Sequence, residues 1–196
     1  VETLLNETVR QTSRLADESS RYLLSAGGKR VRPSLVLLAA QWAAQLTPGA
    51  DADSFDVVKA GAVVELTHLA TLYHDDVMDE APVRRGAPAA HHVWNNSVAI
   101  LTGDVLLARA SSLCSELGPR AVLLQSETFE RLVLGQLSEY TGPEDEADPI
   151  AHHIRVLSDK TGSLIAACGE FAVLASGGSP ELVEPLREYG ENVGVA

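Results

Sequence analysis

Prolines and glycine-containing breaks divide this chain into long stretches that carry helix-forming residues, and this division most constrains the fold. One stretch runs through residues 57–79 without a proline. Gly27-Gly28, Thr47-Pro48-Gly49 and Gly118-Pro119 lie between stretches and are typical of helix ends. Aromatic residues make up only 5% of the chain, whereas Ala and Leu are abundant, which favours helix over sheet. The sequence therefore predicts one all-α domain over residues 1–196.

The breaks also predict where the individual helices lie. We expect helices ending near residue 25, from 33 to 46, in the low fifties to 79, and over 91–117, 119–140, 149–175 and 180 onward. Asp51 or Asp53 would cap the third helix, and Pro185 would kink the last. Residues 80–90 would form a loop, and the acidic run 144–148 a solvated loop.

Charge and cysteine content exclude several classes of protein. The net charge of −12 argues against nucleic acid as a partner, because binding to a phosphate backbone requires a basic face. Cys114 and Cys168 lie in apolar helical patterns without metal-ligand spacing and are interpreted as reduced core thiols. No uninterrupted apolar run of about 18 residues and no signal-peptide layout is found. We therefore expect a cytoplasmic protein without a transmembrane segment.

Three aspartates close the proline-free stretch. Asp75 and Asp79 are four residues apart and share one helix face, whereas Asp76 is turned aside by roughly 100°. An exposed acidic helix end is the ordinary interpretation of such a cluster. Here the preceding residues 63–73 are largely apolar, so the carboxylates would end a buried helix. Oxygen ligands without paired Cys or His favour Mg²⁺, held by one or two carboxylates and by substrate phosphates.

Two short basic segments could supply the complementary charge. Lys29, Arg30 and Arg32 fall on a break between helices, and Arg84 and Arg85 follow the aspartates closely. Arginine binds phosphate oxygens through a planar fork, and lysine binds them as a point charge. The spacing is not that of a P-loop, and the first segment alone could be a solvated turn. Two basic segments together with the aspartates predict a metal–diphosphate site.

These motifs, in this order, resemble those of the trans-type polyprenyl diphosphate synthases. The matching segments are Gly28-Lys29-Arg30-Val31-Arg32-Pro33, Glu65-Leu66-Thr67-His68, Asp75 to Asp79, Arg84-Arg85-Gly86, Gly103-Asp104-Val105-Leu106-Leu107-Ala108, Gly135-Gln136-Leu137 and Lys160-Thr161-Gly162. The resemblance covers residues 27–175. It implies a bundle of long helices around a central cavity, and a Mg²⁺-dependent prenyltransferase of isoprenoid biosynthesis.

The resemblance also implies residue roles. Isopentenyl diphosphate would be held by Lys29, Arg32, His68 and Arg85. The allylic diphosphate would be bound by Arg84, Lys160 and Thr161 and would share Mg²⁺ with Asp75 and Asp79, with Asp76 as a further ligand candidate. Asp75, Asp79, Arg84 and Lys160 would be the catalytic residues. They would promote ionisation of the allylic diphosphate, attack by the isopentenyl double bond and loss of a proton.

Further expectations concern product length and assembly. In the family the chain grows along the helix before the aspartates, where Ala70 and Thr71 are small and would not block it. Tyr73 would lie about 200° round the helix, away from the same groove. We expect a geranylgeranyl or longer product, within the medium-to-long class. We also expect a homodimer through the apolar residues 98–107 and 122–134, and contact with a membrane surface when long products are released.

Several alternatives remain beside this interpretation. The family's second aspartate-rich motif is absent, so we expect a chain truncated at its carboxy end, inactive alone, rather than a natural short protein. His74-Asp75 is also the dyad of some metal-dependent phosphohydrolases, although that class gives no role to the basic residues. A non-catalytic regulatory subunit is the other alternative. His68 taken alone would be a structural histidine, and Gln136 could line the site or only pack.

Overall fold

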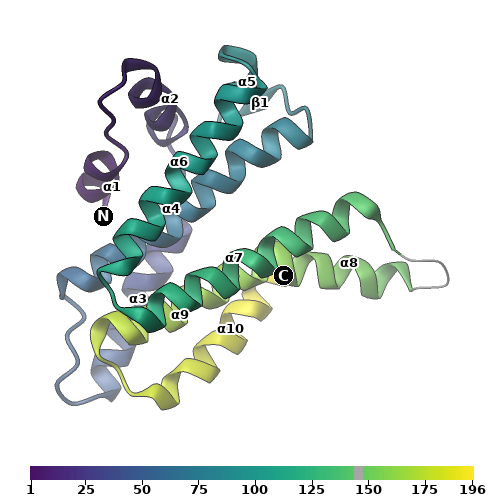
Figure 1. Cartoon of the computed structure of the whole chain (residues 1–196). Helices are drawn as coiled ribbons and strands as arrows, with labels where there is room; N and C mark the ends of the chain where they lie inside the picture. Colours follow the sequence, from purple (N-terminus) through teal and green to yellow (C-terminus); the bar gives the residue numbers. More distant parts are fainter. Residues whose placement is uncertain (144–147) are drawn as a thin grey trace.

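The computed structural model describes residues 1–143 and 148–196, and helices dominate them (Figure 1). The helices are α1 (Glu2–Thr8), α2 (Arg14–Ser25), α3 (Val31–Leu46), α4 (Phe55–Met78), α5 (Ala90–Val93), α6 (Asn96–Ser115), α7 (Pro119–Thr141), α8 (Pro149–Leu157), α9 (Ser163–Ser176) and α10 (Val183–Val195). A π-helical turn, Ser158–Gly162, joins α8 to α9, and a 3₁₀ turn, Pro180–Leu182, precedes α10. The all-α expectation is confirmed.

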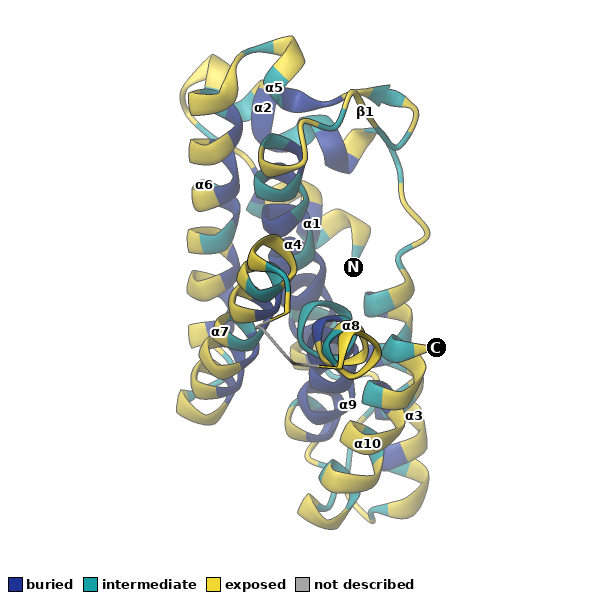
Figure 2. Cartoon of the chain, turned by 90° about the vertical axis from the view of Figure 1, so that its right-hand side faces the viewer, coloured by how far each residue is buried: buried dark blue, intermediate teal, exposed yellow. Residues whose placement is uncertain are grey.

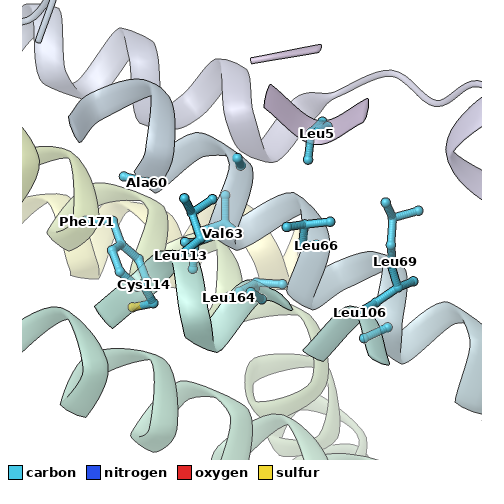
Figure 3. Close-up of a cluster of buried hydrophobic side chains, with 14 of the residues drawn as sticks. Leu5, Ala60, Val63, Leu66, Leu69, Leu106, Leu113, Cys114, Leu164 and Phe171 are labelled. Carbon is cyan, nitrogen blue, oxygen red and sulfur yellow. The ribbon is translucent and has the colours of Figure 1, made fainter. Parts of the chain in front are cut away.

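Helix α4 is the centre of the core. Its residues between Val57 and Tyr73 are buried on almost every side, which matches a segment that is apolar all round. Helices α3, α6 and α9 pack against it. Figure 3 shows Val63 and Leu66 of α4 among side chains of α6 and α9, including Leu113 and Phe171. The last turn of α4 therefore projects its aspartates from a rigid support.

Two expected helices are interrupted where the sequence carries neither glycine nor proline. The first is broken between α1 and α2, where the Gln11 backbone N–H donates to the Asp17 carboxylate at 2.9 Å. The helix expected over 91–117 is broken after α5, because the Asn95 side chain caps α6 by accepting from the Val98 N–H at 2.9 Å. Trp94 at this break packs edge-on against Tyr22, with ring centroids 5.1 Å apart. Both boundaries were predicted wrongly.

Two local expectations about helix ends were also wrong. Ser54, and neither Asp51 nor Asp53, caps α4: its hydroxyl accepts from the Val57 N–H at 3.4 Å and donates to the Ala175 carbonyl at 3.0 Å. Pro185 is the third residue of α10, so its missing N–H falls in the first turn, where no intrahelical partner exists. A kink within the helix is therefore not required.

The expected loop over 80–90 contains a small antiparallel hairpin, β1 (Val83–Arg84) and β2 (Ala87–Pro88). Arg85 and Gly86 form its tip with φ angles of 53° and 79°. The acidic run expected to be a loop lies outside the described residues, except for Asp148, which caps α8.

Helix α6 alone among the described helices is long and apolar enough to cross a membrane, a criterion that buried core helices also meet. Its Ala99, Leu106 and Ala110 are buried, and Figure 2 shows that buried and exposed residues fall on different sides of the helix. The absence of a transmembrane segment stays a prediction.

Candidate functional site

A polar cavity of about 310 Å³ lies where the end of α4 approaches α7 and the π-helical turn. Residues far apart in the sequence line it: Arg32, His68, Thr71, Leu72, Asp75, Asp79, Arg84, Leu132, Lys160, Thr161 and Leu164. Most of the predicted site residues therefore meet in one volume. Carboxylates and cations face each other there, as the pattern of charges in the sequence predicts.

The three aspartates have different environments. Asp75 and Asp79 line the cavity; burial raises the pKa of the half-buried Asp75, Lys160 opposes this change, and Asp79 adds to it. Asp76 is only 1% exposed, and Arg84 binds it through Nε at 2.7 Å and Nη2 at 2.5 Å. Asp76 is therefore the partner of Arg84, and the two cavity aspartates remain for ligands.

The donor set at the cavity suits a hard divalent cation. No group of three or more His, Cys, Asp or Glu side chains gathers as a ready-made metal site among residues 1–143 and 148–196. Two carboxylates on one wall are what Mg²⁺ uses when substrate phosphates complete its coordination. Asp75 and Asp79 fit this arrangement.

Arg32 and His68 form the deeper part of the cavity. The Nε of Arg32 is buried and has no hydrogen-bond partner in the described part of the chain, and burial lowers the pKa of its guanidinium. Burial, with Arg32, Arg85 and Arg84 nearby, lowers the pKa of His68 to about 2. His68 is therefore neutral at physiological pH, and it would act as a hydrogen-bond donor and not as a charge.

A buried carboxylate organises the other arginines. Glu65 is 2% exposed and lies 3.2 Å from Arg30 Nη1 and 3.6 Å from Arg85 Nη2. Burial raises the pKa of Glu65, while the arginines act to lower it. Gly28, at φ 135°, leaves room for this cluster, because a Cβ there would lie 2.6 Å from Arg30 Nη1 and 2.8 Å from Arg85 Cζ. Gly28, at the predicted helix break, thus accommodates two guanidinium groups.

Two predicted ligand residues do not line the cavity. Lys29 is exposed on the connection before α3. Arg85 is turned inward, where it donates to the carbonyl of Leu23 at 2.9 Å and to that of Gly27. Their roles in binding isopentenyl diphosphate stay predictions. Sequence reasoning assigned no role to Glu65, although a carboxylate inside an apolar helix signals a buried charge pair.

An apolar groove of about 650 Å³ adjoins the polar cavity and shares Thr71, Asp75 and Leu132 with it. Its other walls come from α4, α6 and α7: His74, Val77, Met78, Ile100, Asp104, Phe129, Val133, Gln136, Leu137 and Tyr140. Ala70, in contrast, is fully buried in the core and does not line the groove. Tyr73 is buried too, and its hydroxyl accepts from the Leu23 N–H at 3.2 Å. Of the small residues predicted to control product length, only Thr71 lies at the groove.

His74 is held at the side of this groove. Its Nε2 lies 3.1 Å from the Ile100 carbonyl oxygen and 3.3 Å from Asp104 Oδ1. Gly103 leaves space for the ring, since a Cβ there would lie 2.3 Å from His74 Nε2. The side chain thus packs and bonds locally.

Comparison of the sequence with known protein families agrees with this fold and cavity. The polyprenyl synthetase family model matches residues 13–196. The chain belongs to the polyprenyl synthetase family. Nonaprenyl diphosphate synthase of Mycobacterium tuberculosis is 48% identical over 196 residues, covering 100% of this chain and 57% of that protein. This assignment confirms the resemblance and leaves the phosphohydrolase alternative without support.

Solved polyprenyl synthetases share the fold. A polyprenyl synthase from Caulobacter crescentus, complexed with calcium and isoprenyl diphosphate, superposes with a TM-score of 0.89 at 32% identity, covering 98% of this chain and 57% of that one. A geranylgeranyl pyrophosphate synthase from Corynebacterium glutamicum, also with calcium and isoprenyl diphosphate, gives 0.84 at 45% identity, with the same two coverages. The chain thus spans somewhat more than half the length of these polyprenyl synthetases.

Proposed function

We propose that this chain carries the first aspartate-rich half of a prenyltransferase site, which condenses isopentenyl diphosphate with an allylic prenyl diphosphate. One observation carries the proposal: a polar cavity lined by Asp75, Asp79, Arg32, Arg84 and Lys160 adjoins an apolar groove of about 650 Å³. An ionic diphosphate and an apolar tail are the two parts of such a substrate. The adjoining volumes match both parts.

Mg²⁺ would be held by Asp75 and Asp79 together with diphosphate oxygens. When bound, it neutralises charge that develops on the leaving diphosphate. The solved relatives with calcium and isoprenyl diphosphate support a divalent cation at this kind of site. Neither Asp79, which is exposed, nor Asp75, which is half buried, is tied up in an ion pair within the described residues.

The residues of the chain act by position and charge. Lys160, Arg84 and Thr161 would hold the allylic diphosphate, while Arg32 and neutral His68 would hold isopentenyl diphosphate with Lys29 and Arg85. The allylic C–O bond breaks and its electron pair leaves with the diphosphate. The isopentenyl double bond then attacks the allylic carbon, and the proton lost from the adduct passes to the released diphosphate. Fixed cations lower the barrier because the negative charge grows beside them.

The groove supports a geranylgeranyl or longer product, since small Thr71 stands at its entrance from the cavity. Exposed apolar residues on α6 and α7, among them Leu101 and Leu134, support a homodimer through these helices. Location in the cytoplasm and contact with a membrane during release of long products complete the proposal.

The test measures, by calorimetry, how tightly the chain binds farnesyl diphosphate and isopentenyl diphosphate in the presence of Mg²⁺. Asp75→Asn should weaken Mg²⁺-dependent binding of farnesyl diphosphate by at least about tenfold. Asp56→Asn, at the exposed start of the same helix, is the matched control and should change nothing. Unchanged binding by Asp75→Asn would favour the non-catalytic regulatory subunit instead.

A second assay separates the reaction classes. Because this chain carries only half of the site and is expected to be inactive alone, the assay uses a protein that also supplies the second aspartate-rich motif. With both diphosphates present, condensation yields longer prenyl diphosphates, whereas a phosphohydrolase yields monophosphate or alcohol. Chromatographic sizing of the products distinguishes them. Hydrolysis without chain extension would refute the prenyltransferase.

A further inference from the structure

Lys160 and Thr161 do not lie on a regular helix. They belong to the π-helical turn Ser158–Gly162, where the Ser163 N–H bonds to the Ser158 carbonyl. Such turns are rare and less stable than α-helix, and they persist where the surroundings hold them. The position of the two proposed diphosphate ligands thus depends on whatever fixes this turn.

Three residues of α7, spaced by four, face the turn. Gly135 lets the backbones approach, because a Cβ there would lie 2.7 Å from the Lys160 backbone nitrogen. Glu139 accepts from Lys160 Nζ at 2.5 Å. Residues four apart occupy one helix face, so the third member, Arg131, faces the same π-helical turn from one turn of α7 before Gly135.

Arg131 makes the most extensive contact of the three. Its Nε donates to Asp159 Oδ1 at 2.6 Å and its Nη2 to Ser158 Oγ at 2.8 Å, so the guanidinium grips two consecutive residues of the turn. Its Nη1 donates to Glu191 of α10. One side chain thereby joins α7, the turn and α10.

Helix α10 closes the opposite side of the turn. A Cβ on Gly194 would lie 2.5 Å from the Gly162 Cα, so the two backbones are in direct contact. The turn is clamped between α7 and α10, and the Arg131–Glu191 pair links the two sides of the clamp. Ion pairs that form such a partly buried network contribute more than isolated surface pairs.

We propose that Arg131 is a positioning residue, which sets the π-helical turn so that Lys160 and Thr161 present their polar groups to the allylic diphosphate. This inference rests on the proposed function. Arg131 does not line the polar cavity itself and acts only through the turn. The isopentenyl side, with Arg32 and His68 on α3 and α4, is built independently of it. Loss of Arg131 should therefore affect one substrate and spare the other.

The experiment measures the dissociation constants of farnesyl diphosphate and isopentenyl diphosphate, each with MgCl₂, by isothermal titration calorimetry. Arg131→Met should weaken farnesyl diphosphate binding by about tenfold or more and change isopentenyl diphosphate binding by less than about twofold. Arg120→Met is the matched control: Arg120 lies on the same helix and pairs with buried Glu170, away from the turn. This control should leave both constants within about twofold of the wild type.

A second variant guards against misfolding. Asp159→Ala removes the acceptor of the Arg131 Nε–H from the turn and should reproduce the selective loss, and the double variant should lose less than the sum of the two single losses. Equal weakening of both ligands, additive losses, or unchanged farnesyl diphosphate binding with Arg131→Met would overturn the inference. Wild-type protein that binds neither diphosphate would overturn the proposed function, and this inference with it.

Discussion

Asp75, Asp76 and Asp79 are neighbours in sequence, yet they have different physical tasks. Asp76 is buried against Arg84, whereas Asp75 and Asp79 border the polar cavity. A buried carboxylate that keeps its arginine contributes to folding, and removing one partner leaves the other charge unpaired. Replacing aspartate by asparagine should therefore lower stability at position 76 and weaken ligand binding at position 79.

Asp76→Asn should lower the free energy of unfolding by about 2 kcal/mol, less than a fully buried pair because Arg84 is partly exposed. Asp79→Asn should leave unfolding within about 0.5 kcal/mol of the wild type and weaken Mg²⁺-dependent diphosphate binding. Urea unfolding and calorimetric titration of both variants measure these effects. Equal destabilisation by the two substitutions would contradict the assignment.

His68 should make the fold sensitive to acid. Its pKa is about 2 in the folded chain and about 6.5 when unfolded, so below pH 6.5 only the unfolded chain takes up this proton. Stability from this group is complete above pH 6.5 and is lost as the pH falls, at up to about 1.4 kcal/mol per pH unit.

Urea unfolding of wild type and His68→Gln at pH 8, 7, 6 and 5 tests the sign. The free energy of unfolding of the wild type minus that of His68→Gln should be constant between pH 8 and 7 and should shrink between pH 6 and 5. An advantage that grows on acidification would show that His68 is charged in the folded protein.

At the scale of secondary-structure elements, the close contacts of α7 decide where the π-helical turn lies. Gly135→Ala puts a methyl group 2.7 Å from backbone that cannot move alone, so we expect a loss of about 1–3 kcal/mol of stability and weaker farnesyl diphosphate binding. Gly61→Ala in α4 is the matched control, because its Cβ would find neighbours only at 3.5 Å and beyond. It should be neutral or stabilising by up to about 1 kcal/mol.

Thermal and urea unfolding with calorimetric titration measure both glycine variants. If Gly135→Ala were as stable as Gly61→Ala and bound farnesyl diphosphate normally, the tight contact between α7 and the turn would be wrong.

The sequence predicted helices and their breaks well where glycine or proline marks an end, as at Gly27-Gly28 and Gly118-Pro119. It failed at the breaks before α2 and α6, because Asp17 and Asn95 bond to backbone there and Trp94 packs on Tyr22. Those causes are contacts made only in the folded chain and are invisible to local propensity.

The candidate site, too, could be predicted from the sequence only in part. Its charges and their grouping could be predicted, because Asp75 and Asp79 share a helix face and lie near Arg84 in sequence. The bonding partners of these charged residues could not be predicted. Arg84 pairs with Asp76, Arg85 donates to the Gly27 carbonyl, and Lys160 donates to Glu139. These contacts depend on how the hairpin, the helices and the π-helical turn approach one another in the folded chain, and local sequence patterns do not encode such distances.

For the whole molecule, the exposed side of α6 and α7 is the most informative surface. Leu101 and Leu134 are more than half exposed, and Ile100, Val122, Leu123, Val133 and Leu137 are exposed on the same two helices. Apolar residues in this number on neighbouring helices are typical of an interface. We expect a dimer, as the sequence segments 98–107 and 122–134 predict.

Analytical ultracentrifugation should show a dimer at micromolar concentration. Leu101→Glu with Leu134→Glu should raise the dissociation constant by about a hundredfold or more without loss of helical content. Leu46→Glu, an equally exposed leucine on α3, is the control and should remain dimeric. A wild-type monomer, or a control that dissociates equally, would refute this interface.

Within the described residues of one subunit, the apolar groove beside Thr71 has no continuous outer wall, since Met78, Leu137 and Tyr140 along it are about half exposed or more. Leu137, with Ile100 and Val133 of the same groove, also belongs to the surface where we expect the second subunit. A hydrocarbon that lengthens in the groove of a separated subunit would therefore not be stopped by depth, whereas the second subunit of a dimer would cover this side. Its final size would depend on timing, through the ratio between the rate of the next addition and the rate of sideways escape. Product sizes of a variant that cannot dimerise would then spread over several lengths and shift with isopentenyl diphosphate concentration, and vesicles that take up the hydrocarbon would shorten them.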